Sequence, residues 1–199
     1  MAKSGWVIVN PQSGSGNSNV DVTANVHTGR TVRSTTLTFK AANVTDVVRT
    51  VKQAGKPEFV DIDDNAASDK AGKTVTISGI SNSAKLTFSL GTGDLNITLP
   101  SKYIANSVNT DNGANISGDP GASAEYNFSI AISVPSNTGI TALTRQIIVE
   151  DGAGNRDTCT LTLAAGDAYL NVQIGDIELD YLGNKVSVSV ESNTSWTIV

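Results

Sequence analysis

The segment VDIDDN contains the side chains best suited to hold a metal ion. Its oxygen-bearing residues are Asp61, Asp63, Asp64 and Asn65, and carboxylate and amide oxygens at alternate positions are ligands that Ca²⁺ accepts. The spacing does not match an EF-hand loop, because no glutamate occupies the last ligand position. The three aspartates are therefore weak metal candidates, and a solvated acidic linker is the favoured interpretation.

The chain has one histidine and one cysteine. His27 lies in the turn-like segment ANVHTGRT, where a solvated side chain is expected. Cys159, between two threonines in RDTCTLTLA, is expected on a strand as a buried, inert thiol. The sequence has no nucleophile elbow, phosphate-binding loop or Cys/His cluster. These observations predict a non-enzymatic protein that needs no cofactor.

Charge and hydropathy exclude several kinds of partner. The formal net charge is −5, which gives no electrostatic basis for binding nucleic acid or an anionic membrane. No apolar run is long enough to span a bilayer. The first residues, MAKSGWVIVN, lack the apolar core of a signal peptide, which favours a protein made in the cytoplasm.

Alternating apolar and polar residues predict an all-β fold. Turn clusters rich in glycine, such as SGSGN and DGAGN, separate the alternating segments. The segment 43–52 fits a helical period, but its valines and threonines favour a strand. Many short strands at close spacing are typical of a Greek-key β-sandwich. The expected strands cover 19–26, 34–39, 73–78, 85–90, 94–99, 125–134, 158–163, 177–182 and 185–190.

An internal repeat relates the middle of the chain to both of its ends. The segment AGKTVTISGISNSAK resembles LGNKVSVSVESNTSW, and this alignment superposes Asn82 on Asn193. Near the N-terminus Asn25 precedes Arg33 by eight residues. Asn137 and Arg145 have the same spacing, at nearly the same offset along the chain.

This repeat predicts two immunoglobulin-like β-sandwich domains, one of them divided between the chain ends. Residues 58–167 form a whole inserted domain, and 1–57 plus 168–199 form the split one. Neither terminal piece is large enough to bury a two-sheet core alone. The split domain is completed either within one chain, as a circular permutation, or between chains by strand exchange. Its closure contacts are expected at Trp6, Ile8, Trp196 and Ile198.

Joined from C-terminus to N-terminus, the split domain resembles the BACON domain, an immunoglobulin-like module of Bacteroides proteins and their phages. The resemblance covers both terminal pieces in permuted order. The middle repeat has no tryptophan, so its link to the family depends on the internal repeat. The residues that match the family pattern are Asn193, Trp196, Trp6, Gly14, Gly16, Asn25, Arg33 and Gln53.

The resemblance implies either a structural or a sugar-binding role. The first hypothesis is an auxiliary capsid protein, similar to those of crAss-like phages, that decorates the virion surface after assembly in the host cytoplasm. Its partners would be the major capsid protein, other virion proteins and neighbouring copies of itself. The alternative is a carbohydrate-binding or spacer module of a Bacteroides surface enzyme, with Trp6 and Trp196 stacking on a cell-surface glycan. Core packing is the favoured interpretation of both tryptophans.

Overall fold

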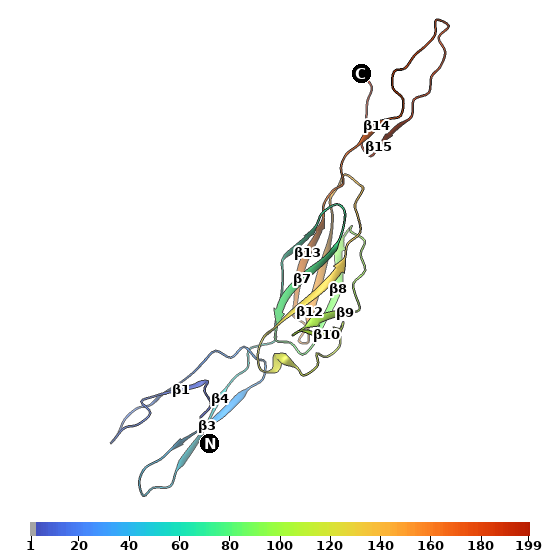
Figure 1. Cartoon of the computed structure of the whole chain (residues 1–199). Helices are drawn as coiled ribbons and strands as arrows, with labels where there is room; N and C mark the ends of the chain where they lie inside the picture. The colour runs from blue at the N-terminus through green and yellow to red at the C-terminus, as the bar shows by residue number, and fades with distance from the viewer. Residues whose placement is uncertain (1–2) are drawn as a thin grey trace.

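The chain is elongated, with a complete β-sandwich in the middle and a thinner arm at each end (Figure 1). The structure, a computed structural model, describes residues 3–199. We call 3–57 the N-terminal arm, 58–167 the central sandwich and 168–199 the C-terminal arm. Apart from one turn of 3-10 helix, every regular element in the described range is a strand, which confirms the all-β fold.

The strands are numbered along the chain. The N-terminal arm contains β1 (Val7–Asn10), β2 (Asp21–Ala24), β3 (Arg33–Phe39) and β4 (Val47–Gln53). The central sandwich contains β5 (Val60–Ile62), β6 (Asn65–Ser68), β7 (Thr74–Ser81), β8 (Leu86–Gly93), β9 (Lys102–Ala105), β10 (Val108–Asp111), the 3-10 turn η1 (Pro120–Ala122), β11 (Tyr126–Ser133), β12 (Leu143–Asp151) and β13 (Arg156–Leu163). The C-terminal arm contains β14 (Leu170–Val172) and β15 (Val190–Ser192).

Two sheets enclose the core of the central sandwich. One has the strand order β10-β9-β11-β7-β5 and the other β6-β13-β12-β8. Side chains alternate between faces along each strand, and in β11 Phe128, Ile130 and Ile132 all point inward and are buried. Phe88 packs against Phe128 from the opposite sheet, with ring centroids 5.8 Å apart.

The arms differ from the central sandwich because they lack facing sheets. In the N-terminal arm β1 pairs only with β2, and β3 only with β4. The C-terminal arm has the single pair β14–β15. Val7 and Leu37 are the buried hydrophobic residues of the described part of the arms. Most apolar side chains of both arms therefore face solvent.

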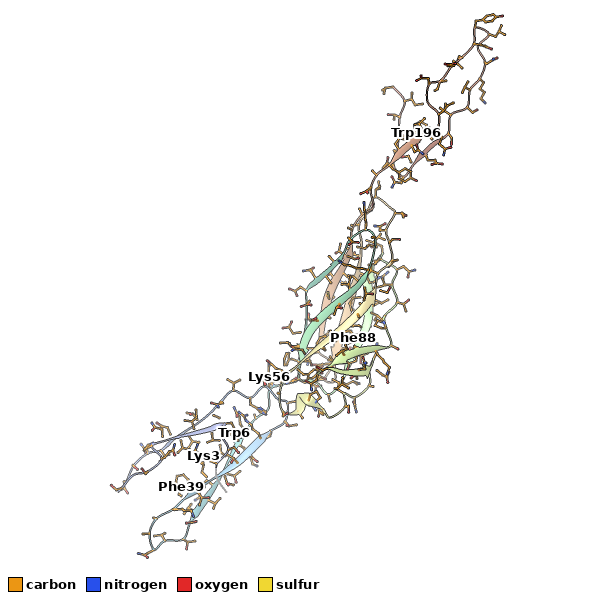
Figure 2. The ribbon with its side chains drawn as sticks, in the orientation of Figure 1. Lys3, Trp6, Phe39, Lys56, Phe88 and Trp196 are labelled. Atoms are coloured by element: carbon orange, nitrogen blue, oxygen red, sulfur yellow. The ribbon has the colours of Figure 1, made fainter. Side chains whose placement is uncertain are left out.

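The structure does not bring the expected closure residues together within one chain. Trp6 lies in the N-terminal arm and Trp196 in the C-terminal arm, at opposite ends of the central sandwich (Figure 2). Ile8 and Ile198 lie in the same two arms and are largely exposed. Closure as a circular permutation is thus absent from the described chain, because the central sandwich stands between its two halves.

The remaining expectations about single elements can be stated briefly. The ambiguous segment near residue 47 is strand β4. None of the helical structure in residues 3–199 is long and apolar enough to cross a membrane. Cys159 is fully buried on β13, as its strand context predicts.

We predict that Cys159 does not react with a thiol reagent while the protein is folded. Burial first, and then the charges of Asp63, Asp64 and Asp157, raise the pKa of this thiol to about 11, so little thiolate is present near pH 8. The rate of reaction with a chromogenic disulfide should rise sharply only in denaturant. Rapid labelling in native buffer would contradict the buried position.

Candidate functional site

Asn82 connects the N-terminal arm to the central sandwich. Its side chain is fully buried. The side-chain Oδ1 accepts a hydrogen bond from the backbone N–H of Phe59 (3.0 Å), and Nδ2 donates to the carbonyl oxygens of Pro57 (3.1 Å) and Thr28 (3.4 Å). One amide group therefore holds a loop of the arm, the linker and the first strand of the sandwich.

Asn193 makes the same set of contacts where the C-terminal arm begins. Its Oδ1 accepts from the N–H of Tyr169 (3.0 Å), and Nδ2 donates to the carbonyl oxygens of Asp167 (2.9 Å) and Thr138 (3.3 Å). All three partners follow the corresponding partners of Asn82 at one constant offset, which is one residue shorter than the separation of the two asparagines. The two joints of the chain are thus two copies of one structure.

The strands beside these asparagines repeat as well. The hydroxyl of Ser81 donates to the carbonyl of Phe59, and that of Ser192 donates to the carbonyl of Tyr169. Val60 pairs with Ser81 between β5 and β7, as Leu170 pairs with Ser192 between β14 and β15. The C-terminal arm is therefore built like the first strands of the central sandwich.

The turn that follows β6 has its own counterpart in the C-terminal arm. Gly72 and Gly183 both have a positive φ, and each donates its N–H to the carbonyl of an aspartate three residues earlier, Asp69 or Asp180. Residues 176–179 thus stand where β6 stands in the central sandwich, and 185–192 stand where β7 stands.

The N-terminal arm corresponds to the remaining strands. The pair Arg33↔Gln53 of β3–β4 and the pair Leu143↔Leu163 of β12–β13 are related by the offset that relates the partners of the two asparagines. Strand β2 by the same offset matches the end of β11. The arm therefore contains the counterparts of β11, β12 and β13, with β1 beside β2 as β9 lies beside β11.

This register differs by two residues from the alignment based on asparagine and arginine spacing. Nδ2 of Asn137 donates to the carbonyl of Thr141 (2.8 Å), while Nε2 of His27 lies 2.7 Å from the carbonyl of Thr31. The structure thus places His27, rather than Asn25, at the position of Asn137. Their side chains are unlike, so residue identity gave no signal for this pairing.

Arg33 brings several family-pattern residues together in the N-terminal arm. Its guanidinium lies 4.6 Å from the ring centroid of Trp6, donates to Oε1 of Gln53 (2.9 Å) and donates to the carbonyl of Asn25 (2.8 Å). A cation over an indole face is attracted by the ring and helps to fix its position. Trp6 is therefore held by the arm itself.

Arg145 has a different environment in the central sandwich. It donates to the backbone carbonyls of Leu95 (2.8 Å) and Gly91 (3.1 Å). It therefore ties the end of β8 to the following segment, and no aromatic ring of the described residues stacks on it.

Burial differs sharply between matching positions of the central sandwich and the arms. Ile62 is 2% exposed, whereas its counterpart Val172 in the C-terminal arm is 48% exposed. Ile132 is 0% exposed, whereas its counterpart Val22 in the N-terminal arm is 42% exposed. Each arm thus presents to solvent the face that its counterpart buries.

A groove of about 640 Å³ lies between the two hairpins of the N-terminal arm. Its apolar lining comes from Val9, Val20, Leu37 and Phe39. Val149 is the counterpart of Phe39 and is paired with Phe88 of β8. The groove therefore corresponds to space that β8 fills in the central sandwich.

The acidic segment does not form a metal centre. No group of three or more His, Cys, Asp or Glu side chains within residues 3–199 is arranged to hold a metal ion. Asp63 instead accepts a hydrogen bond from the N–H of Ser78 (2.9 Å). Asp61 and Asp64 border the same shallow surface at the edge of β5, so the structure does not gather the three carboxylates.

Comparisons with known proteins give little guidance. No protein-family model matches the chain, and no curated protein matches it. Among solved structures, an endo-fucoidan hydrolase from glycoside hydrolase family 107 aligns over 83% of this chain with 10% identity and a TM-score of 0.30. The aligned part is 22% of that hydrolase chain. The resemblance to BACON domains stays a prediction.

We predict that one substitution has unequal effects at the two asparagines. Asn82→Ala should lower the free energy of unfolding of the central sandwich by about 1–3 kcal/mol, since it leaves buried backbone groups without partners. Asn193→Ala should change it by less than about 0.5 kcal/mol, because the groups it releases can bind water. Urea denaturation followed by circular dichroism measures both, and equal losses would contradict the assignment.

Proposed function

We propose that this protein is a non-enzymatic structural protein of a virion, which decorates the capsid surface and displays its β-sandwich domains there. Its partners are the major capsid protein or other virion proteins, and neighbouring copies of itself. This role follows the resemblance to BACON-type immunoglobulin-like domains in phages.

One observation supports an assembly role above others. A complete sandwich carries two unfinished half-domains at opposite ends, and each exposes apolar positions that a finished domain buries. Exposed apolar faces of this extent are typical of protein interaction sites. A building block that is incorporated in many copies can cover such faces, whereas a free monomer leaves them in water.

The test is binding to virions. We expect the purified protein to bind capsids of a deletion phage and to restore the surface density seen by electron microscopy on wild-type capsids. Substituting Asp for Val172 should reduce this binding, because the charge lies on the exposed apolar face, while Asp at exposed Ile104 of the central sandwich serves as the matched control. Deletion capsids that look unchanged and bind no protein would refute the proposal.

A second candidate function, glycan binding, is favoured by a single residue. The side chain of Trp196 is 47% exposed, and an exposed indole can stack on a sugar ring. Binding on a glycan array that Trp196→Ala abolishes in a folded protein would favour a carbohydrate-binding module over a capsid protein.

A further inference from the structure

We propose that the C-terminal arm of one copy completes the N-terminal arm of a second copy by strand exchange, so that copies join head to tail. The inference depends on the matching strands and charges of the two arms, and it is independent of the proposed virion role. The two arms together supply every strand of the central sandwich except β10 and most of β8. The C-terminal arm contributes the counterparts of β5, β6, β7 and the start of β8.

The first sheet of the composite domain follows from the pairing of β11 with β7. Ile132 pairs with Val75, and Ala131 pairs with Thr76. The repeat offsets transfer these pairs to Val22 with Val186 of the second copy, and to Asp21 with Ser187 of the second copy. The resulting order is β1-β2-β15-β14, in which residues 185–192 lie between β2 and β14.

The second sheet follows from the parallel pairing of β13 with β6. Leu161 pairs with Ala66, and Thr162 pairs with Ala67. The same transfer places Val51 opposite Ile177 and Lys52 opposite Glu178, with each partner from the other copy. An apolar pair therefore faces the core, and oppositely charged side chains meet on the outer face.

The last residues of the chain complete this second sheet. They follow Asn193 as β8 follows Asn82, and β8 pairs with β12, the counterpart of β3. Trp196 and Ile198 alternate along this final segment. The groove lined by Leu37 and Phe39 is the space that their side chains would fill.

The charges of the arms are complementary. Residues 1–57 contain seven Lys and Arg against two Asp, a formal charge of +5. Residues 168–199 contain one Lys against four Asp and Glu, a formal charge of −3. Opposite charges favour association of the two arms and discourage pairing of like arms.

The joints of the described chain favour a second copy over closure on itself. The N–H groups of Ala164 and Gly166 donate to the carbonyls of Ser68 (3.0 Å) and Gly139 (2.7 Å), and Asn193 adds its bonds beyond them. These bonds direct the C-terminal arm away from the N-terminal arm (Figure 1). Self-closure must break this joint, whereas strand exchange retains it.

Cysteine cross-linking tests the pairing directly. Asp21 and Ser187 correspond to Ala131 and Thr76, which lie directly opposite each other on neighbouring antiparallel strands, where Cβ atoms are about 4.5–5.5 Å apart. Proteins carrying Asp21→Cys or Ser187→Cys alone are unfolded together, refolded as a mixture and oxidised. We expect a disulfide-linked heterodimer on a non-reducing gel, and a ladder from the double variant.

The matched control is Ser189→Cys, which lies two residues along the same strand. Diagonal neighbours are about 7–8 Å apart, beyond the reach of an unstrained disulfide, so the yield with Asp21→Cys should be several times lower. A cross-linked monomer from the double variant, with no heterodimer from the mixture, would overturn the proposal in favour of self-closure. Equal yields at 187 and 189, or none, would overturn the register.

Charge reversal supplies a second test that does not depend on oxidation. Lys52→Glu or Glu178→Lys alone places like charges opposite each other and should weaken self-association about fivefold. The double variant should recover the affinity of the original protein, because each joint receives one residue from each copy. Light scattering across concentration measures it, and no recovery would contradict the pairing.

Tryptophan emission gives the readout at the joint itself. The chain has two tryptophans, Trp6 and Trp196, and both lie in the arms (Figure 2). Their emission should shift to shorter wavelength as concentration rises and the composite domain buries them. An emission maximum that stays constant while the particle grows would show that the copies associate through another surface, which overturns the proposal.

Discussion

A sheet with one apolar face needs a second sheet to remove that face from water, and the energetics of this chain depend on that need. The central sandwich meets it, with Phe88 and Phe128 packed between two sheets of its own. Neither arm does. Burying one medium-sized apolar side chain contributes about 1.5–3 kcal/mol, so the many exposed apolar positions of the arms represent a large driving force for association.

The hydrogen bonds at the joints decide where that driving force acts. Asn82 and Asn193 each tie a loop, a linker and a strand with a single side-chain amide. Because the same bonds recur, the C-terminal arm leaves the central sandwich in the way that the central sandwich leaves the N-terminal arm. The geometry of the first joint therefore indicates where a completed third domain would lie.

Residue pattern alone predicted much of this. Period-2 alternation identified nearly all the long strands, and the segments ISNS and ESNT identified the repeated asparagine, since their backbone contacts require that side chain. The alignment of Asn25 with Asn137 was displaced by two residues, because His27 makes the equivalent contact with a different side chain. The direction of the arms could not be predicted, since it depends on backbone bonds at Gly139 and Gly166 that leave no mark in the pattern.

The two joints, although built alike, do not have the same stiffness. At the first, Arg30 donates to both carboxylate oxygens of Asp119 and to the carbonyl of Asn82, so the arm is braced on a second side. Its counterpart at the second joint is Ile140, which is largely exposed and makes no such brace. A row of copies would consequently bend mainly at every other joint, with rigid two-domain segments between hinges. Such a row would follow a curved surface in steps, each as long as one segment.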